Sequence, residues 1–264
     1  MGGGASKQVR PTSANPKSGA NIKASNELAK TLFTAGVKKV VMIRHANAQP
    51  RDPEAAAVEA GTVLKPDTPH ANAWTVGDLT RDLTPKGEEQ AAAAKAWFDQ
   101  LDVRAVIASE ATRAIKTKDI MTDGKFPKGG PGCLTLHTLH PARSGTPDCE
   151  KMFDKLGYGT LNTYYADMSV EGCEGKGKPI FRNYMNKVTT ELHALIKSGM
   201  ADFGASGDTV AVFGHAVFLN AVAVAVSEAM GIPDAEMKVA ELELGEAQGI
   251  MCDGSAQSVQ LMMV

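Results

Sequence analysis

Two histidines and two arginines in this sequence follow apolar runs, and together they could do chemistry on a phosphoryl group. Arg44 and His45 follow one run, His215 follows another, and Arg113 comes one helical turn after Ser109, which follows a third. Guanidinium is planar, permanently charged and forked, so two arginines can bind the non-bridging oxygens of a phosphoryl group. A phosphate is therefore the ligand that this set of side chains predicts.

The histidines suit the transfer of that phosphoryl group. An imidazole held in one tautomer by a backbone carbonyl is a competent nucleophile near neutral pH, because its ordinary pKa is about 6.5. We expect His45 to attack in line and form a phosphohistidine intermediate, which water or another acceptor then releases. His215 would donate to a phosphoryl oxygen in the transition state, and Ser109, at a predicted helix N-terminus, could also meet the anion. The scheme requires no metal ion and no other cofactor.

The elements that must position these groups alternate along the chain. Apolar runs predict strands, at residues 38–43, 103–108, 134–139, 209–213, 239–244 and 259–263. Helical patterns fall between them, at 84–98, 109–121, 149–156, 161–167, 179–198 and 216–230. Such alternation predicts an α/β protein, a three-layer α/β/α sandwich with a mostly parallel central sheet. Because ligands of such sheets bind beyond the carboxyl ends of the strands, the groups named above should meet at one edge.

Size and charge limit the class of protein. The chain has 264 residues, and 28 basic against 30 acidic side chains give a net charge of −2. That balance provides no positive field for nucleic acid, so we expect no nucleic-acid partner. Four cysteines without a Cys-x-x-Cys pair indicate reduced intracellular thiols. We divide the chain into a flexible tail with a short helix at 1–36 and a single domain at 37–264, with insertions at about 50–76 and 122–180.

The N-terminal residues carry a separate signal. Gly2 follows the initial methionine, and Ser6 completes a pattern typical of N-myristoylation. Basic residues in the first 26 positions, where no acidic residue occurs, would add attraction to an anionic membrane. An ordinary flexible tail and an organelle transit peptide are the alternatives. We expect a cytoplasmic protein, with Gly2 as the candidate lipidation site for peripheral membrane association through the N-terminus.

Four ordered segments carry a resemblance to a known family. They read Val-Val-Met-Ile-Arg-His-Ala-Asn-Ala at 40–48, Asp-Leu-Thr-Arg-Asp-Leu-Thr-Pro-Lys-Gly at 78–87, Ser-Glu-Ala-Thr-Arg-Ala-Ile-Lys-Thr at 109–117 and Val-Phe-Gly-His at 212–215. At these positions the chain resembles the histidine phosphatase superfamily, also called phosphoglycerate mutase-like. The resemblance implies that fold, His45 as the nucleophile, and a phosphate pocket of Arg44, Arg113 and His215 shaped by Ser109. The Arg-His-Ala-x-Ala form looks most like the phosphohistidine phosphatase branch.

The proton donor has no clear match. Members of the family that act on alkyl phosphates use a Glu or Asp to protonate the leaving oxygen, usually from the segment after the third strand. Here that segment offers His137, His140, Asp148 and Glu150. Of these, Glu150, Asp148 and His140 are the three candidates for the general acid. Without such an acid, substrates with good leaving groups, such as phosphohistidine or phosphoanhydrides, become the better fit.

These observations favour a metal-independent phosphatase that acts through a phosphohistidine on His45. Its substrate would be a phosphoprotein or a small phosphorylated metabolite. Two alternatives stay open. One is a catalytically weak phosphoryl-binding or scaffold protein on the same fold, whose two insertions bind partners. The other is a phosphomutase, which would return the phosphoryl group to its substrate.

Overall fold

The computed structural model describes residues 27–28, 30–50, 77–157, 159–166, 177–199 and 206–263. Gly2 and nearly all of the predicted insertion at 50–76 lie outside these residues. The described elements follow in chain order: β1 Lys39–Arg44, α4 Gly77–Thr80, α5 Pro85–Phe98, β2 Val103–Ala108, α6 Thr112–Met121, β3 Cys133–Thr135, η1 His137–Leu139, η2 Pro141–Arg143, α7 Pro147–Leu156, α8 Leu161–Tyr165, α9 Gly177–Gly199, β4 Thr209–Gly214, α10 Phe218–Ala229, α11 Ala235–Ala240, β5 Gly249–Asp253 and β6 Ser258–Met262. Among the helices in these ranges, none is both long and apolar enough to cross a membrane.

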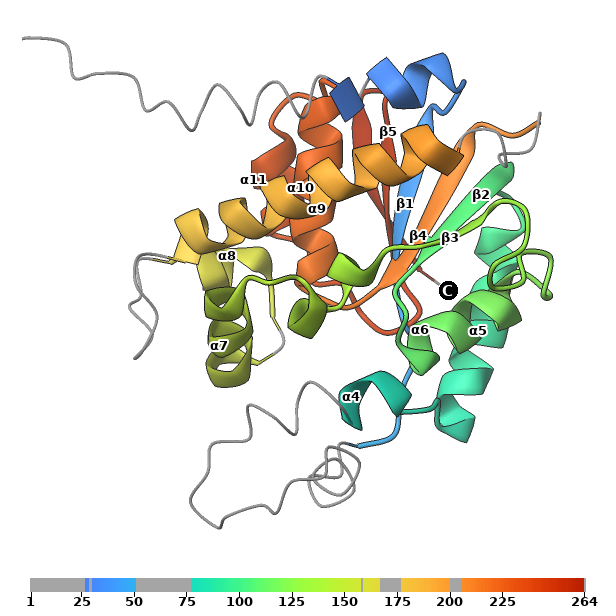
Figure 1. Cartoon of the computed structure of the whole chain (residues 1–264), viewed down its shortest axis with the longest axis horizontal. Coiled ribbons are helices and arrows are strands. Elements are labelled where there is room, and N and C mark those ends of the chain that lie inside the picture. Colours follow the sequence, from blue (N-terminus) through green and yellow to red (C-terminus); the bar gives the residue numbers. More distant parts are fainter. Residues whose placement is uncertain are drawn as a thin grey trace, which may run out of the picture.

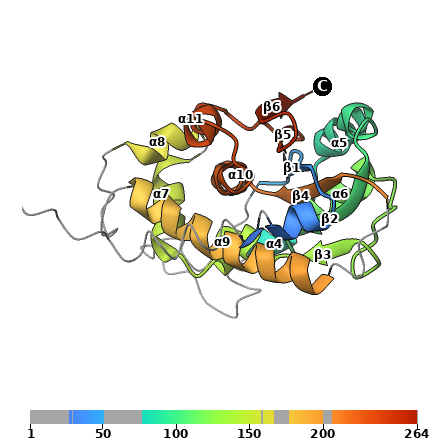
Figure 2. The same cartoon turned by 90° about the horizontal axis from the view of Figure 1, so that it is seen from above.

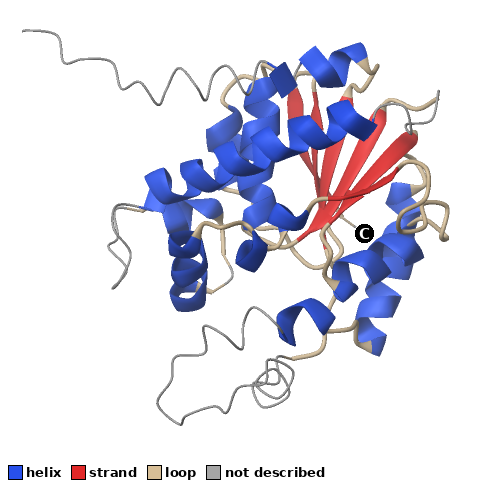
Figure 3. Cartoon of the chain, viewed as in Figure 1, coloured by secondary structure: helices blue, strands red, loops and turns tan. Residues whose placement is uncertain are grey.

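One six-stranded sheet forms the centre of the molecule, in the order β3-β2-β4-β1-β5-β6 (Figures 1 and 3). The first four strands in that order are parallel, and β5 and β6 are antiparallel to their neighbours. The prediction of an α/β fold with a mostly parallel sheet is confirmed.

Helices cover both faces of the sheet, which makes the three predicted layers. Alternate residues of β1 enter different cores: Val40 and Met42 pack with α9 and α10, whereas Val41 and Ile43 pack with α5. Because successive side chains of a strand point to opposite faces, one unbroken apolar run supplies both cores. Figure 2, seen from above, shows α9 and α10 on one side of the strands and α5 and α6 on the other.

Three predicted elements were wrong in type or extent. The predicted strand 134–139 is short, because after β3 the chain turns into the 3₁₀ helix η1. Residues 239–244 form no strand: the segment contains the end of α11 and a turn, and the fifth strand lies further on at β5. The helix predicted from 109 begins at Thr112. In the first two cases an apolar pattern was compatible with two structures, and tertiary packing selected between them. In the third case the predicted cap, Ser109, contacts His215 instead.

The topology brings three separated strands together where their polar ends can meet. In the sheet β4 lies between β1 and β2, and all three run in the same direction. Their carboxyl ends therefore reach one edge, which carries Arg44, Ser109 and His215 on or just after the strands. Helix α4 lies beyond that edge (Figure 1).

Candidate active site

His45 stands directly after β1 and is held by both of its ring nitrogens. Nδ1 donates to the carbonyl oxygen of Ala46 at 2.7 Å, and Nε2 accepts from Nε of Arg113 at 3.1 Å. Since an arginine can only donate, the ring proton lies on Nδ1 and the lone pair on Nε2. The tautomer with a basic Nε2 is the form that a nucleophilic histidine requires.

Electrostatics keep His45 neutral. Only 4% of the residue is exposed. Burial, followed by the charge of Arg113, lowers the pKa of His45 well below its ordinary value, and the contact with Ala46 opposes this only in part. The imidazole therefore keeps its lone pair at neutral pH without a base to remove a proton.

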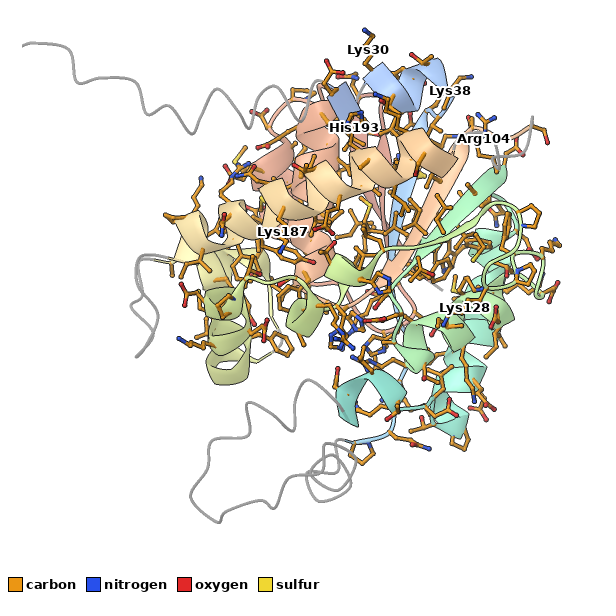
Figure 4. All side chains as sticks on the ribbon, viewed as in Figure 1. Lys30, Lys38, Arg104, Lys128, Lys187 and His193 are labelled. Carbon is orange, nitrogen blue, oxygen red and sulfur yellow. The ribbon has the colours of Figure 1, made fainter. Side chains whose placement is uncertain are left out.

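One guanidinium joins the two histidines. Besides the bond to His45, Nη2 of Arg113 donates to Nδ1 of His215 at 3.1 Å. The two imidazole centroids lie 5.2 Å apart at an interplanar angle of 62°. The structure thus brings together His45, Arg113 and His215, which lie on three separate elements. Nitrogen atoms gather at this edge of the sheet, close to α4 (Figure 4).

His215 has a defined tautomer as well. Nδ1 accepts from Arg113, so its proton lies on Nε2, which donates to Oγ of Ser109 at 3.0 Å. Burial, Arg113 and His140 lower the pKa of His215 well below its ordinary value. Ser109 was predicted to begin a helix; it does not, because Ala111 precedes the first turn of α6 and Ser109 instead contacts His215.

The backbone after His215 is strained. Val217 has φ +54° and ψ −41°, and Phe218 N donates to Ala216 O at 2.8 Å across it. This is the rare γ-turn with positive φ, which costs about 1–3 kcal/mol in a residue other than glycine. This turn lies between the end of β4 at Gly214 and the start of α10 at Phe218, and His215 lies directly before it.

Asp78 belongs to the same cluster, although sequence reasoning assigned it no role. Its Oδ2 accepts from Nη2 of Arg113 at 2.6 Å and its Oδ1 from Nη1 of Arg81 at 2.6 Å; Nη1 of Arg113 also donates to its carbonyl. Burial alone would raise the pKa of Asp78, but the hydrogen bond from His140 and the charge of Arg113 outweigh it and hold that pKa well below its ordinary value. The Asp-x-x-Arg spacing was the only signal in the sequence.

The remaining predicted residues lie at different places. Arg44 donates from Nη1 to the carbonyl of Leu244 at 2.9 Å, and its charge contributes to the lowered pKa of His45. His140 is fully buried beside His215, with ring centroids 5.0 Å apart. Asp148 and Glu150 lie in the first turn of α7, where Asp148 is 40% exposed and pairs with Lys151 at 3.7 Å.

Two hydrogen bonds and one close packing contact support the loop after β1. Ala46 N donates to Oγ1 of Thr117 at 3.0 Å, and Asn47 N donates to Gln90 at 2.8 Å. A Cβ at Gly87 would lie 2.0 Å from the carbonyl oxygen of Asn47. Helix α5, which Thr84 caps through a bond from Gly87 N, can therefore approach the loop only because this position has no side chain.

Replacing Gly87 with alanine should destabilise the protein by at least about 2 kcal/mol, since the new methyl group overlaps backbone that cannot turn away. In an ordinary helix the same change stabilises by about 0.5–1 kcal/mol, so the sign of the change is informative. Urea unfolding measures it. Glu89→Ala, at an exposed neighbouring position, is the control and should change little; a stabilised Gly87→Ala protein would contradict the contact.

Comparison with known proteins agrees with this picture. Residues 67–127 match the model of the histidine phosphatase superfamily (branch 1), a segment that contains Asp78 and Arg113 but neither His45 nor His215. No curated protein sequence gave a significant match. Residues 67–127 therefore carry a sequence signature of the histidine phosphatase superfamily, in agreement with the predicted resemblance.

Solved structures match most of this chain at low identity and with TM-scores below 0.5. A phosphoserine phosphatase from Entamoeba histolytica with 3-phosphoglyceric acid is 15% identical with a TM-score of 0.47, over 84% of this chain and 94% of that one. A mycobacterial glucosyl-3-phosphoglycerate phosphatase with inorganic phosphate is 15% identical with a TM-score of 0.47, over 85% and 94%. The protein histidine phosphatase SixA with tungstate is 15% identical with a TM-score of 0.41, over 85% and 96%. At these values the neighbours carry no argument about substrate.

Proposed function

We propose that the protein is a metal-independent phosphatase that forms a phosphohistidine on His45. One observation carries the proposal: a single buried guanidinium, that of Arg113, lies 3.1 Å from Nε2 of His45 and 3.1 Å from Nδ1 of His215. An anion drawn to that guanidinium would meet a nitrogen lone pair on one side and a second imidazole on the other.

In the first step Nε2 of His45 bonds to phosphorus while the bond from phosphorus to the leaving oxygen breaks. Arg113 exchanges its bond to Nε2 for bonds to non-bridging oxygens, where negative charge is concentrated in the transition state. The contact between Nδ1 and Ala46 stabilises the positive charge that develops on the ring. Arg44 would supply further positive charge to the pocket.

In the second step water attacks phosphorus, the bond to Nε2 breaks, and inorganic phosphate leaves. His45 returns to its neutral form, which its lowered pKa favours. We propose a phosphoprotein or a small phosphorylated metabolite as substrate, because the Arg-His-Ala-x-Ala sequence resembles the phosphohistidine phosphatase branch. If the phosphoryl group passed from His45 to an organic acceptor, the protein would be a mutase. If no phosphoryl group were transferred to His45, it would be a phosphoryl-binding module.

Trapping the intermediate tests the proposal. Acid-labile, base-stable phosphate should be recovered on His45 after brief mixing with p-nitrophenyl phosphate, and inorganic phosphate should be released at the same rate with and without EDTA. The chemistry uses no metal, because protein side chains supply both the charge and the nucleophile. Tungstate binding without any phosphoenzyme would point to the binding module, and a loss of activity in EDTA would contradict the mechanism.

A further inference from the structure

We propose that His140, backed by Asp78, is the general acid and base of this site, in place of a Glu or Asp from α7. The inference rests on the proposed phosphatase function and extends it to the proton. It selects one of the three candidates for the general acid that the sequence left open, and it adds Asp78 as the residue that orients this acid.

The geometry connects His140 to the reacting groups in two ways. Its ring lies edge-on to that of His215, with centroids 5.0 Å apart and an interplanar angle of 88°. Its Nε2 donates to Oδ2 of Asp78 at 2.9 Å, the same oxygen that accepts from Nη2 of Arg113 at 2.6 Å. Imidazole, carboxylate and guanidinium thus form one continuous network around the phosphoryl site.

This contact determines which nitrogen of His140 exchanges a proton. An ionised Asp78 can only accept, so Nε2 of His140 carries its proton in every state, and Nδ1 is the nitrogen that gains or loses one. A carboxylate behind an imidazole orients the ring and stabilises the imidazolium, as the aspartate of a serine protease triad does.

The alternative donors are placed less well. Asp148 is 40% exposed and pairs with Lys151 of its own helix, and it lines a separate cavity of about 240 Å³ with Thr146, Cys149 and Asn183. Glu150 lies on the same turn of α7.

The proton balance closes over the two steps. In the first, His45 Nε2 bonds to phosphorus, the electron pair of the broken bond goes to the leaving oxygen, and Nδ1 of protonated His140 gives that oxygen its proton. In the second, water oxygen bonds to phosphorus and its proton passes to Nδ1 of His140. The electron pair of the broken N–P bond returns to His45.

The groups around His140 set the pH range. Burial, with the charge of Arg113, lowers the pKa of His140 by more than Asp78 and Glu110 raise it, so that the pKa of His140 lies below its ordinary value. The pKa of His45, which has no carboxylate on its ring, lies well below its ordinary value. Attack needs His45 neutral and His140 protonated. Activity on esters with poor leaving groups should therefore fall as the pH rises through the pKa of His140.

The test compares two substrates in single turnovers at about pH 5.5, because the lowered pKa of His140 leaves most of this ring neutral near pH 7. Phenyl phosphate releases a phenol that resembles the tyrosine side chain, with a pKa of about 10, and p-nitrophenyl phosphate releases a much better leaving group. His140→Gln places an amide donor near the position of Nε2, so the bond to Asp78 is kept while the proton is lost. It should slow phosphoenzyme formation from phenyl phosphate by about 100-fold and leave the p-nitrophenyl rate nearly unchanged.

His137→Gln is the matched control, since His137 lies three residues earlier with a side chain 66% exposed, and neither rate should change. Equal losses with both substrates, or none, would overturn the role of His140. If the variant does not fold, the unmodified protein answers the question: only the phenyl phosphate rate should decrease with rising pH, and parallel profiles would refute the proposal. Absence of any phosphohistidine from p-nitrophenyl phosphate would instead refute the proposed function itself.

Discussion

Alanine in place of His45 is expected to lower kcat on p-nitrophenyl phosphate by about 10⁴-fold or more, because removing a nucleophile leaves only binding and charge stabilisation. Tungstate should still bind, since Arg113 and His215 remain. The measurement is phosphate release together with the recovery of labelled phosphoenzyme, which should vanish. A variant that still turns over at a tenth of the original rate would show that another group attacks phosphorus.

The pH dependence of the same residue provides a second readout. A histidine of ordinary pKa, about 6.5, would lose its lone pair on acidification below that value. Burial and Arg113 lower the pKa of His45 well below it, so the rate with p-nitrophenyl phosphate should hold as the pH falls from 7 to about 5.5.

A histidine outside the active-site cluster serves as the control for His45→Ala. His193 on α9 contacts Thr31 at 3.0 Å and is labelled well away from the nitrogen-rich edge in Figure 4. His193→Gln should leave kcat unchanged. Thermal unfolding of both variants separates loss of chemistry from loss of fold.

Substitution of Arg113 is expected to have the next largest effect. The three guanidinium nitrogens of Arg113 donate hydrogen bonds to His45, His215 and Asp78. Lysine retains the charge, but its single nitrogen cannot make all of these bonds. We expect Arg113→Lys to lower kcat/KM by about 10³-fold, comparable with removing a transition-state donor, while the fold is largely kept.

Arg113→Ala goes further, because it leaves the buried carboxylate of Asp78 without this counter-charge. Removing one partner of a buried ion pair costs about 3–5 kcal/mol of unfolding free energy. The double variant Arg113→Ala with Asp78→Ala should recover part of that stability without recovering activity. If Arg113→Lys kept full activity, the guanidinium would not be the group that bridges the two histidines.

The local pattern of the sequence was enough to predict the strands and the polar residues that follow them. β-branched apolar runs of five or six residues are buried on both faces in an α/β sheet, so β1, β2 and β4 could be recognised, and with them Arg44-His45, Ser109 and His215. Because parallel strands end at one edge, the convergence of His45, Arg113 and His215 also followed from the pattern.

Contacts between residues far apart in the sequence could be identified only from the tertiary structure. Asp78 comes shortly before Thr84, which caps a helix. Its neighbours in the sequence do not indicate that its carboxylate contacts Arg113 and His140, 35 and 62 residues away. The sequence predicts Ser109 as a helix cap, but in the folded chain its hydroxyl oxygen accepts a hydrogen bond from His215, 106 residues further along. Capping and apolar periodicity are properties of neighbours in the chain, whereas a buried charge network depends on which side chains the packed layers bring within about 3 Å.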